Sequence, residues 1–488
     1  MAEFGAAVAR SARSRAGRRS SVWYDMRADV MPLLLLLFGA IVLRVAFFTS
    51  APPLLNPDSA GYYVPARNLV YGDGFDLGLR RTPTYPLFVA AVVSFVGEDL
   101  QALVTVQHFL FGPLLVVLTY LLGRLAASRL TAILASVLVM VSGPLLLYEH
   151  YVMTEVPFAI LLLASLSTTI LATRRASLRW AAATGLLFGL LVLCRPSGQI
   201  LAPLIGGTLL LLMPAPWSRR LAALGVLAAC ALVVVVPWMA YNRQTQGAFV
   251  IAGSGRFLLA RTLKMDPGGF TFETPPGVVE TGTQAAARRI VQEEAAKTKP
   301  ASVAQRFRDE LGLSDAEAYP LMQGFALQAI RNRPIYFVTS TIEAFTEIVL
   351  GEPIAIRREG VPLADADFER RARGALRKPV YPLDSARAQP LVSIYDPSRY
   401  GWTVPILFAL GMVVALLRAR QRWLLLPALA TLALIGGSAA LVGGELRYRF
   451  PQEPLIALVL CGGLVGLAEL GLGLARRRRD RARETVAA

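Results

Sequence analysis

The sequence predicts an all-α polytopic membrane protein with about ten spans. Of its 488 residues, 55% are hydrophobic, and the mean hydropathy is +0.51. Long apolar runs recur along the chain, and each can cross the roughly 30 Å hydrocarbon layer as a helix that satisfies its own backbone hydrogen bonds. The expected spans are 31–49, 101–123, 130–147, 156–172, 180–194, 198–213, 221–241, 402–417, 423–443 and 454–475. A shorter run at 83–95 predicts an interfacial or re-entrant helix.

Charge predicts the orientation of these spans. The formal net charge is +17, and basic clusters lie at both ends, at Arg10–Arg19 and Arg476–Arg483. If 83–95 does not cross, four further basic clusters share the side of the N-terminus, as the positive-inside rule requires. They are Arg124/Arg129, Arg174/Arg175/Arg179, Arg219/Arg220 and Arg418/Arg420/Arg422. Both termini are therefore expected in the cytoplasm, where basic tails meet anionic lipid headgroups. No folded basic domain accompanies the tails, so nucleic acid is not an expected partner.

Five segments follow from this topology. They are a basic cytoplasmic tail (1–30), a catalytic transmembrane module (31–255) with an external loop (50–100), an extracytoplasmic helical segment that is a possible acceptor region (256–401), C-terminal spans (402–475) and a second basic tail (476–488). Amphipathic patterns with capping residues predict helices over 283–297 and 301–334. The stretch 333–350 should form a packed or interfacial helix outside. Cys194, Cys230 and Cys461 lie in or beside apolar runs and are expected to be small buried residues.

The short cytoplasmic loops argue against a cytosolic nucleotide as the sugar or energy source. They contain neither a Walker A sequence nor a GxGxxG pattern. The unusual polar residues collect instead in the loops assigned to the outer face. Any chemistry is therefore expected to be extracytoplasmic.

Asp58 is the first candidate residue, within "NPDSAGYYVPARNLVYGDGF" just after the first span. Either Asp58 or Ser59 is expected to cap the helix that follows. A carboxylate at a helix start is also favoured in its charged form, which a general base requires. Capping and catalysis are compatible, and both interpretations stay open at this stage.

Outer-face arginines form a second group of candidates. Arg80 and Arg81 lie in "LRRTPTYP", Arg195 ends a span, and Arg447 lies in "ELRYRFP". They could hold lipid phosphates or clamp a phosphate leaving group, since guanidinium binds phosphate in bidentate fashion. Arg44 lies inside the first span, where an arginine needs an ion-pair partner or a task.

Glu149, His150 and Glu155 form a third group, in "YEHYVMTEVPF". One histidine and two carboxylates could hold a divalent ion, although a hydrogen-bonded interfacial cluster is the simpler interpretation. The chain has only two histidines, His108 and His150, which excludes a histidine-rich metal site.

Five stretches in order resemble motifs of the GT-C membrane glycosyltransferases. They are "PDSAGYYVPARNLVYGDGF", "RRTPTYPLFVAAV", "YVMTEVPFAILLLASL", "VPWMAYNRQTQGAFV" and "ELRYRFPQEPLIAL", and they cover roughly 30–255 and 440–470. The sequence is most similar to the family-39/PMT-like group, which includes protein O-mannosyltransferases and lipid A aminoarabinose transferases. Where that group often has Asp-Glu, this chain has Asp58-Ser59.

This resemblance implies transfer of a sugar from a polyprenyl-phosphate donor to a glycan, lipid or protein acceptor. Asp58 takes the position of the catalytic base, and Arg81, with Arg80, takes the phosphate-contacting position before the proline. Glu155 takes the second acidic position. No cofactor is required, although a divalent metal is compatible. Further residues expected near the substrate are Tyr62, Tyr63, Glu149, His150, Arg243 and Tyr448.

The sequence also predicts a location, and two other functions compete with sugar transfer. Frequent Ala, Arg and Leu suggest a high-GC bacterium, so the expected place is the bacterial plasma membrane. A flippase or transporter of lipid-linked sugars should carry ionisable residues at mid-membrane, and beyond Arg44 the spans offer few. A non-catalytic scaffold of an envelope-glycan complex should tolerate changes at Asp58 and Arg81.

Overall fold

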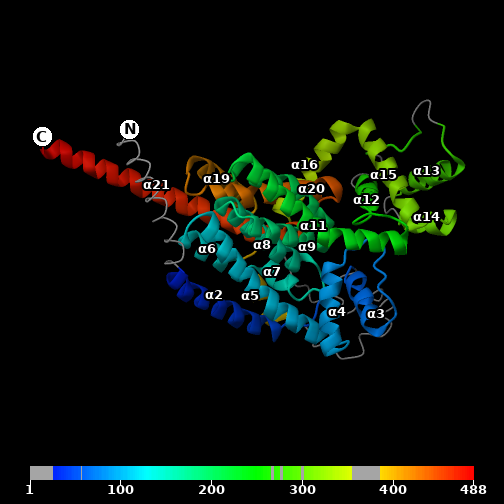
Figure 1. Ribbon diagram of the computed structural model, residues 1–488, viewed down its shortest axis with the longest axis horizontal. Coiled ribbons are helices and arrows are strands. Elements are labelled where there is room, and N and C mark those ends of the chain that lie inside the picture. Colours follow the sequence, from blue (N-terminus) through cyan, green and yellow to red (C-terminus); the bar gives the residue numbers. More distant parts are fainter. Residues whose placement is uncertain are drawn as a thin grey trace.

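The structure is a computed structural model that describes residues 26–55, 58–264, 269–274, 279–297, 302–353 and 385–487. Across these ranges every regular element is a helix, and β structure is limited to two isolated bridges, Leu54 with Tyr151 and Ser142 with Tyr395. Figure 1 shows most helices packed side by side in an elongated bundle, from whose end α21 (Glu453–Ala487) projects. The predicted all-α polytopic class is confirmed. Two expected parts lie outside the described residues. They are the basic N-terminal tail up to residue 25 and residues 354–384 of the expected extracytoplasmic region 256–401.

Six described helical stretches are long and apolar enough to cross a membrane. They are Ala28–Phe48 in α2 (Met26–Phe48), α5 (Leu100–Ala126), α8 (Glu155–Arg175), α11 (Trp217–Gln246), Arg422–Leu441, which contains α20 (Leu425–Leu441), and Leu446–Gly473, which contains the start of α21. The other four expected spans correspond to shorter helices. They are α6 (Arg129–Met140) with α7 (Gly143–Tyr148), α9 (Leu178–Cys194), η1 (Pro196–Leu201) with α10 (Ala202–Leu212), and α19 (Thr403–Leu417). The count of ten and the side of each terminus therefore stay predictions.

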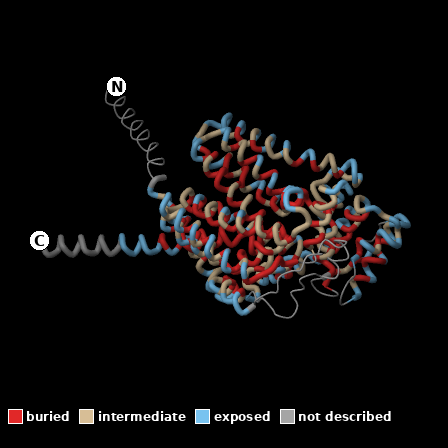
Figure 2. The backbone as a smooth tube through the Cα atoms, turned by 90° about the horizontal axis from the view of Figure 1, so that it is seen from below, coloured by how far each residue is buried: buried red, intermediate tan, exposed pale blue. Residues whose placement is uncertain are grey.

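Short polar residues set the limits of several of these helices. Asp99 precedes α5 and accepts hydrogen bonds from the backbone N–H groups of Gln101 and Ala102, and Ser128 caps α6 in the same way. Between spans, Gly185 of α9 allows close contact with α11, because a Cβ there would lie 2.3 Å from the carbonyl oxygen of Leu227. The buried residues run along the middle of the packed helices in Figure 2. The short apolar run expected at the membrane surface forms α4 (Thr84–Val96).

A second hydrophobic core lies outside the main bundle. It is built by α12 (Gly255–Lys264), α13 (Gly282–Ala295), α14 (Val303–Leu311) and α15 (Asp315–Asn332), which we call the helical segment. In Figure 1 these helices gather at the end of the molecule that also holds α3 (Ala60–Tyr71) and α4. Leu79, from the connection between α3 and α4, is a member of this second core.

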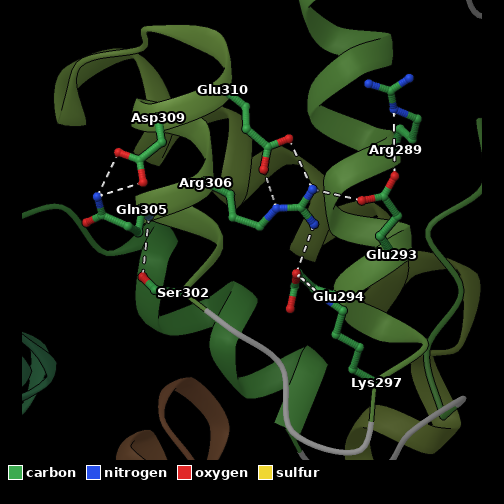
Figure 3. Close-up of polar contacts among 9 residues, drawn as sticks. All are labelled: Arg289, Glu293, Glu294, Lys297, Ser302, Gln305, Arg306, Asp309 and Glu310. Carbon is green, nitrogen blue, oxygen red and sulfur yellow. Dashed lines mark hydrogen bonds and ion pairs between the residues drawn. The ribbon is translucent and has the colours of Figure 1, made fainter.

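Caps and ion pairs hold the helical segment together. Capping boxes start α13 at Thr281 and α15 at Ser314. Arg306 of α14 pairs with Glu293 and Glu294 of α13 and with Glu310 of its own helix (Figure 3). The predicted helix over 283–297 is confirmed, whereas 301–334 divides into α14 and α15 because Gly312 takes a left-handed conformation, φ 67°.

The expectations for the stretch 333–350 and for the three cysteines have mixed outcomes. The stretch 333–350 forms α16 (Pro334–Leu350), which packs against α20, so the predicted packed helix is confirmed. Cys194 and Cys461 are buried, as expected, whereas Cys230 on α11 is only partly buried.

Candidate functional site

Asp58 lies between the end of α2 and the start of α3. The loop before it is tied to the end of α7, since Leu54 donates its backbone N–H to the carbonyl oxygen of His150 at 2.9 Å. The N-cap residue of α3 is Ser59, whose side chain makes no capping hydrogen bond. Of the two expected capping residues, Ser59 holds the N-cap position without capping α3 through its side chain, and the Asp58 carboxylate binds arginines.

Three guanidinium groups surround the Asp58 carboxylate. Arg80 Nη2 and Arg81 Nη2 each donate to Oδ1 at 2.6 Å, and Arg447 Nη1 donates to Oδ2 at 2.8 Å. Arg81 is fixed further by Tyr62, whose hydroxyl accepts from Nη1 at 2.7 Å and whose ring lies beneath the guanidinium. The side chain of Asp58 is only 18% exposed. The result is one partly buried anion held by three cations, which define an anion-binding position.

These cations control the ionisation of Asp58. Burial alone would raise the pKa of its carboxyl group, but the charges of Arg81, Arg447 and Arg80 outweigh burial and hold the pKa well below the ordinary value of 3.8. The carboxylate is therefore ionised at neutral pH. It is also a weak base for as long as all three arginines remain on it.

A second charged pair lies beside the first group. Arg195, which follows α9, pairs with Glu155 at the start of α8, with 3.2 Å between Nη1 and Oε1. The guanidinium groups of Arg195 and Arg447 both lie near the ring of Tyr448, 5.5 and 5.4 Å from its centroid. Tyr448 therefore lies between the two charged groups and contacts an arginine of each.

One cavity of about 650 Å³ contains both groups. Its lining includes four arginines (Arg80, Arg81, Arg195 and Arg447) and two carboxylates (Asp58 and Glu155), so the formal charge of the lining is +2. The remaining wall is neutral and largely apolar. Much of it comes from residues 196–197 and 199–200, from residues 249–254 with Phe257, Leu258 and Gln323, and from Gly437, Ser438, Leu441 and Val442 at the end of α20.

Eight of the candidate residues line this cavity, and their roles stay predictions. They are Asp58, Tyr62, Arg80, Arg81, Glu155, Arg195, Arg447 and Tyr448. Two other expected pocket residues do not line it. Tyr63 is fully buried in the hydrophobic core, and Arg243 is exposed near the end of α11.

Glu149 and His150 also belong elsewhere, in a buried cluster near the end of α2. Glu149 Oε1 accepts from Arg44 Nη2 at 2.5 Å, and its Oε2 lies 2.9 Å from His108 Nδ1. His150 Nδ1 lies 3.2 Å from the carbonyl oxygen of Pro52. The expectation that Arg44 is a structural ion-pair member is confirmed.

The three residues considered as metal ligands are consequently not brought together. Glu149 pairs with Arg44, His150 faces a backbone carbonyl, and Glu155 pairs with Arg195. Within the described ranges no group of three or more His, Cys, Asp and Glu side chains has an arrangement that could hold a metal ion. Glu149, His150 and Glu155 therefore do not form one site in this structure, and metal dependence stays untested.

The loop 249–254 was missed by sequence reasoning, although it supplies much of the cavity wall. Trp238 Nε1 donates to the carbonyl oxygen of Ile251 at 2.9 Å, and Asn242 Nδ2 donates to that of Val250 at 2.8 Å. Both donors lie in "VPWMAYN", so this stretch holds the loop in place, and its Met239 also lines the cavity. The motif was a usable signal, but the loop that it holds has no pattern of its own.

Comparisons with known proteins define the fold. No protein family model matches the sequence, and no curated protein sequence matches it. Among solved structures, the chain is similar to the oligosaccharyltransferase AglB from Archaeoglobus fulgidus, with a TM-score of 0.50, 14% identity, and coverage of 94% of this chain and 52% of AglB. ArnT from Cupriavidus metallidurans gives a TM-score of 0.37 and 15% identity, covering 91% of this chain and 79% of ArnT.

The protein thus has the fold of the GT-C membrane glycosyltransferases, as the sequence resemblance predicted. The chain spans about half the length of AglB, which it matches along almost all of its own length.

Proposed function

We propose that this protein transfers a sugar from a polyprenyl-phosphate-linked donor to a hydroxyl group of an extracytoplasmic acceptor, with inversion at the anomeric carbon. The observation that carries the proposal is the Asp58 carboxylate held by Arg80, Arg81 and Arg447 in a cavity whose lining has a formal charge of +2. A base candidate and an anion-binding position are thereby adjacent, as such a transfer requires.

The charge of the cavity suits the change in charge during transfer. The phosphodiester of the donor carries one negative charge, and the departing polyprenyl phosphate is a monoester that approaches two, since the second pKa of such a phosphate is about 6. Fixed guanidinium groups stabilise this developing charge more than they stabilise the donor. That difference is what accelerates the reaction.

The proposed step is a single displacement. The acceptor oxygen forms a bond to the anomeric carbon while the bond from that carbon to the phosphate oxygen breaks. The electron pair of the broken bond leaves with the phosphate, and Asp58 takes the proton of the acceptor hydroxyl. Donor phosphate would draw arginines away from Asp58, which would raise its pKa toward the ordinary value and make it a better base.

The similarity to AglB supports the proposed class of lipid. AglB was solved in complex with an inhibitory peptide and a dolichol-phosphate, which is a polyprenyl phosphate. With 14% identity, the likeness extends to the fold, so we infer the lipid class for this chain from its own arginines together with that precedent. A bacterial plasma membrane, an extracytoplasmic site and a cell-wall glycan, lipid or protein acceptor remain part of the proposal.

Glu155 and Arg195 are given a supporting role in this proposal. Their ion pair lies next to Arg447 across Tyr448 and restricts the direction of the Arg195 guanidinium. We assign Arg195 to binding the donor phosphate and Glu155 to holding the Arg195 side chain in position. No step of the proposed reaction needs a metal ion, because the arginines supply the positive charge.

The test is a donor screen with purified protein. Polyprenyl-phosphate mannose, arabinofuranose and glucose are each incubated with membrane extract as acceptor, and released polyprenyl phosphate is measured, with Asp58→Asn as the control. Release that depends on Asp58 supports a transferase. Movement of intact donor across a vesicle membrane without release would instead indicate a transporter, and full activity of Asp58→Asn would remove the assigned base.

A further inference from the structure

Two of the three arginines that contact Asp58, Arg80 and Arg81, lie between two anchors in different parts of the fold. Leu79 precedes them, is 1% exposed, and packs in the core of the helical segment rather than in that of the spans. Thr82 follows them, and its hydroxyl donates to the carbonyl oxygen of Cys194, the last residue of α9, at 3.2 Å. Arg80 and Arg81 therefore span the boundary between the helical segment and the main bundle.

The backbone of Leu79 is fixed to the same boundary. Its carbonyl oxygen accepts from the backbone N–H of Gly253 at 2.7 Å. Gly253 is pressed against α15, since a Cβ on it would lie 1.9 Å from Cδ2 of Tyr319. The rest of its loop is bound by Trp238 and Asn242 of α11. Leu79 is consequently held by its side chain and by its main chain, and both contacts lead to the helical segment.

We propose that Leu79 is a positioning residue through which the helical segment sets the place of the Arg80 and Arg81 guanidinium groups. The consequence for phosphate binding rests on the function proposed above. The physical reason is geometric, because charge-assisted hydrogen bonds from a rigid guanidinium require a defined position, and a displacement near 1 Å can cost roughly 100-fold in rate. Packing within the helical segment thereby acts on the phosphate site, although no arginine of the segment's described helices lines the cavity.

Ordinary core packing is the competing explanation, and it predicts a different pattern. If Leu79 only stabilises the helical segment, its truncation should act like any other truncation in that core. Ile290 of α13 offers the matched comparison, since it is also 1% exposed and belongs to the same core but to a helix that does not carry the arginines. Leu79→Met keeps the volume and should preserve the anchor.

The first measurement needs no ligand. Hydrogen exchange followed by mass spectrometry is carried out on the full chain in detergent, for wild type, Leu79→Ala, Leu79→Met and Ile290→Ala. We expect faster exchange in the peptide that contains residues 80–83 only for Leu79→Ala. Equal effects of Leu79→Ala and Ile290→Ala on this peptide, or none for Leu79→Ala, would overturn the proposal.

The second measurement is the affinity for farnesyl phosphate, a short polyprenyl phosphate. We expect Leu79→Ala to weaken it about tenfold or more, and Leu79→Met and Ile290→Ala to stay near wild type. Wild-type affinity in a Leu79→Ala protein would reject the link to phosphate binding. If wild type itself binds no farnesyl phosphate, the proposed phosphate site fails, while the exchange result still decides the coupling. Should Leu79→Ala not fold, Leu79→Val replaces it in both measurements. We expect the same pattern, with smaller changes in exchange rate and in affinity.

Discussion

Arg447 Nη1 donates to Oδ2 of Asp58 at 2.8 Å, although 389 positions separate the two residues in the chain. The contact joins the loop after the first span to the turn before the last. It closes the anion-binding position on the side opposite Arg80 and Arg81, which both bind Oδ1. The site therefore depends on the two ends of the membrane module being brought together.

Replacing Asp58 by Asn should separate catalysis from phosphate binding. We expect transfer to fall by about 10²- to 10⁴-fold, because the general base is lost. Affinity for polyprenyl phosphate should rise, because a neutral amide competes less for the three arginines. Transfer rate and binding of farnesyl phosphate measure the two effects. A variant that loses both, while its thermal unfolding is unchanged, would contradict the idea that Asp58 and phosphate compete for the same cations.

Removing one cation from the site should lower the rate without loss of folding. Arg81→Gln and Arg447→Gln are each expected to reduce kcat/KM for the donor by about 10²- to 10³-fold, the usual range for one donor to a developing anion. Arg243→Gln is the matched control, because Arg243 is exposed and does not line the cavity. A reduction by Arg243→Gln as large as that by Arg447→Gln would mean that general surface charge, and not the cavity, carries the effect.

The pH dependence should reveal the arginines around Asp58. In the free protein its pKa lies well below 3.8, so its carboxylate stays ionised as the pH falls through the weakly acidic range. Since kcat/KM reports the free enzyme, it should show no acid limb from Asp58 between about pH 5 and 7. The acid limb of kcat should lie at higher pH than any acid limb of kcat/KM. The reason is that bound donor phosphate draws the arginines away from Asp58 and so raises its pKa.

The same shift has a stability consequence with a defined sign. Because the folded pKa of Asp58 is below the unfolded value, its stabilising contribution is complete above about pH 4 and is lost as the pH falls through the folded pKa. Thermal unfolding of wild type and Asp58→Asn at several pH values measures it. A kcat/KM limb or a stability loss centred near pH 6 and absent from Asp58→Asn would show that the carboxyl group is not held by three cations.

The buried pair of Arg44 and Glu149 should be worth more to folding than any surface ion pair. Both side chains are 0% exposed, so removing one partner leaves an uncompensated buried charge, at a cost of about 3–5 kcal/mol. Arg44→Met should therefore lower stability strongly, and Arg44→Met/Glu149→Gln should recover part of the loss. Denaturant unfolding in detergent measures both. A double variant no more stable than Arg44→Met would show that the two residues do not act as a pair.

Chelation of divalent ions should leave the proposed transfer in place. The four arginines that line the cavity already give it an excess of positive charge for the leaving phosphate. Transfer is measured after dialysis against a chelator and again after Mg²⁺ or Mn²⁺ is restored. A rate that disappears on chelation and returns with the ion would require a metal site that includes residues beyond those assigned to the cavity.

The charged part of the site could be predicted because its members carry local signals. Asp58, Arg80 and Arg81 lie in short motifs near one span end, and Arg195 stands out as an arginine on the side where the charge bias disfavours it. The predicted topology then assigns their loops to one face of the membrane. The pairing of Asp58 with Arg80, Arg81 and Arg447, and that of Arg195 with Glu155, became known only from the structure.

Side-chain direction was the main source of error. Glu149 and His150 follow the six-residue helix α7, which is too short for periodicity to show which way they point. They turn toward Arg44 and Pro52 instead of the cavity. Arg243 lies near the end of a 30-residue helix whose exposed side is set by packing against α9. The neutral cavity wall was missed for a related reason, since Gln323 and residues 437–442 approach it only through long-range packing.

The place of Leu79 limits how freely this protein could be rebuilt from parts. Its side chain belongs to the core of the helical segment, although in sequence Leu79 lies 176 positions before the start of α12 at Gly255. A chimera that exchanged residues 255–332 for the corresponding region of another protein would leave this leucine facing a foreign surface. Exchange of the helical segment between such proteins would therefore require the graft to be made in two pieces, with the residue before the arginine pair chosen to fit the incoming helices.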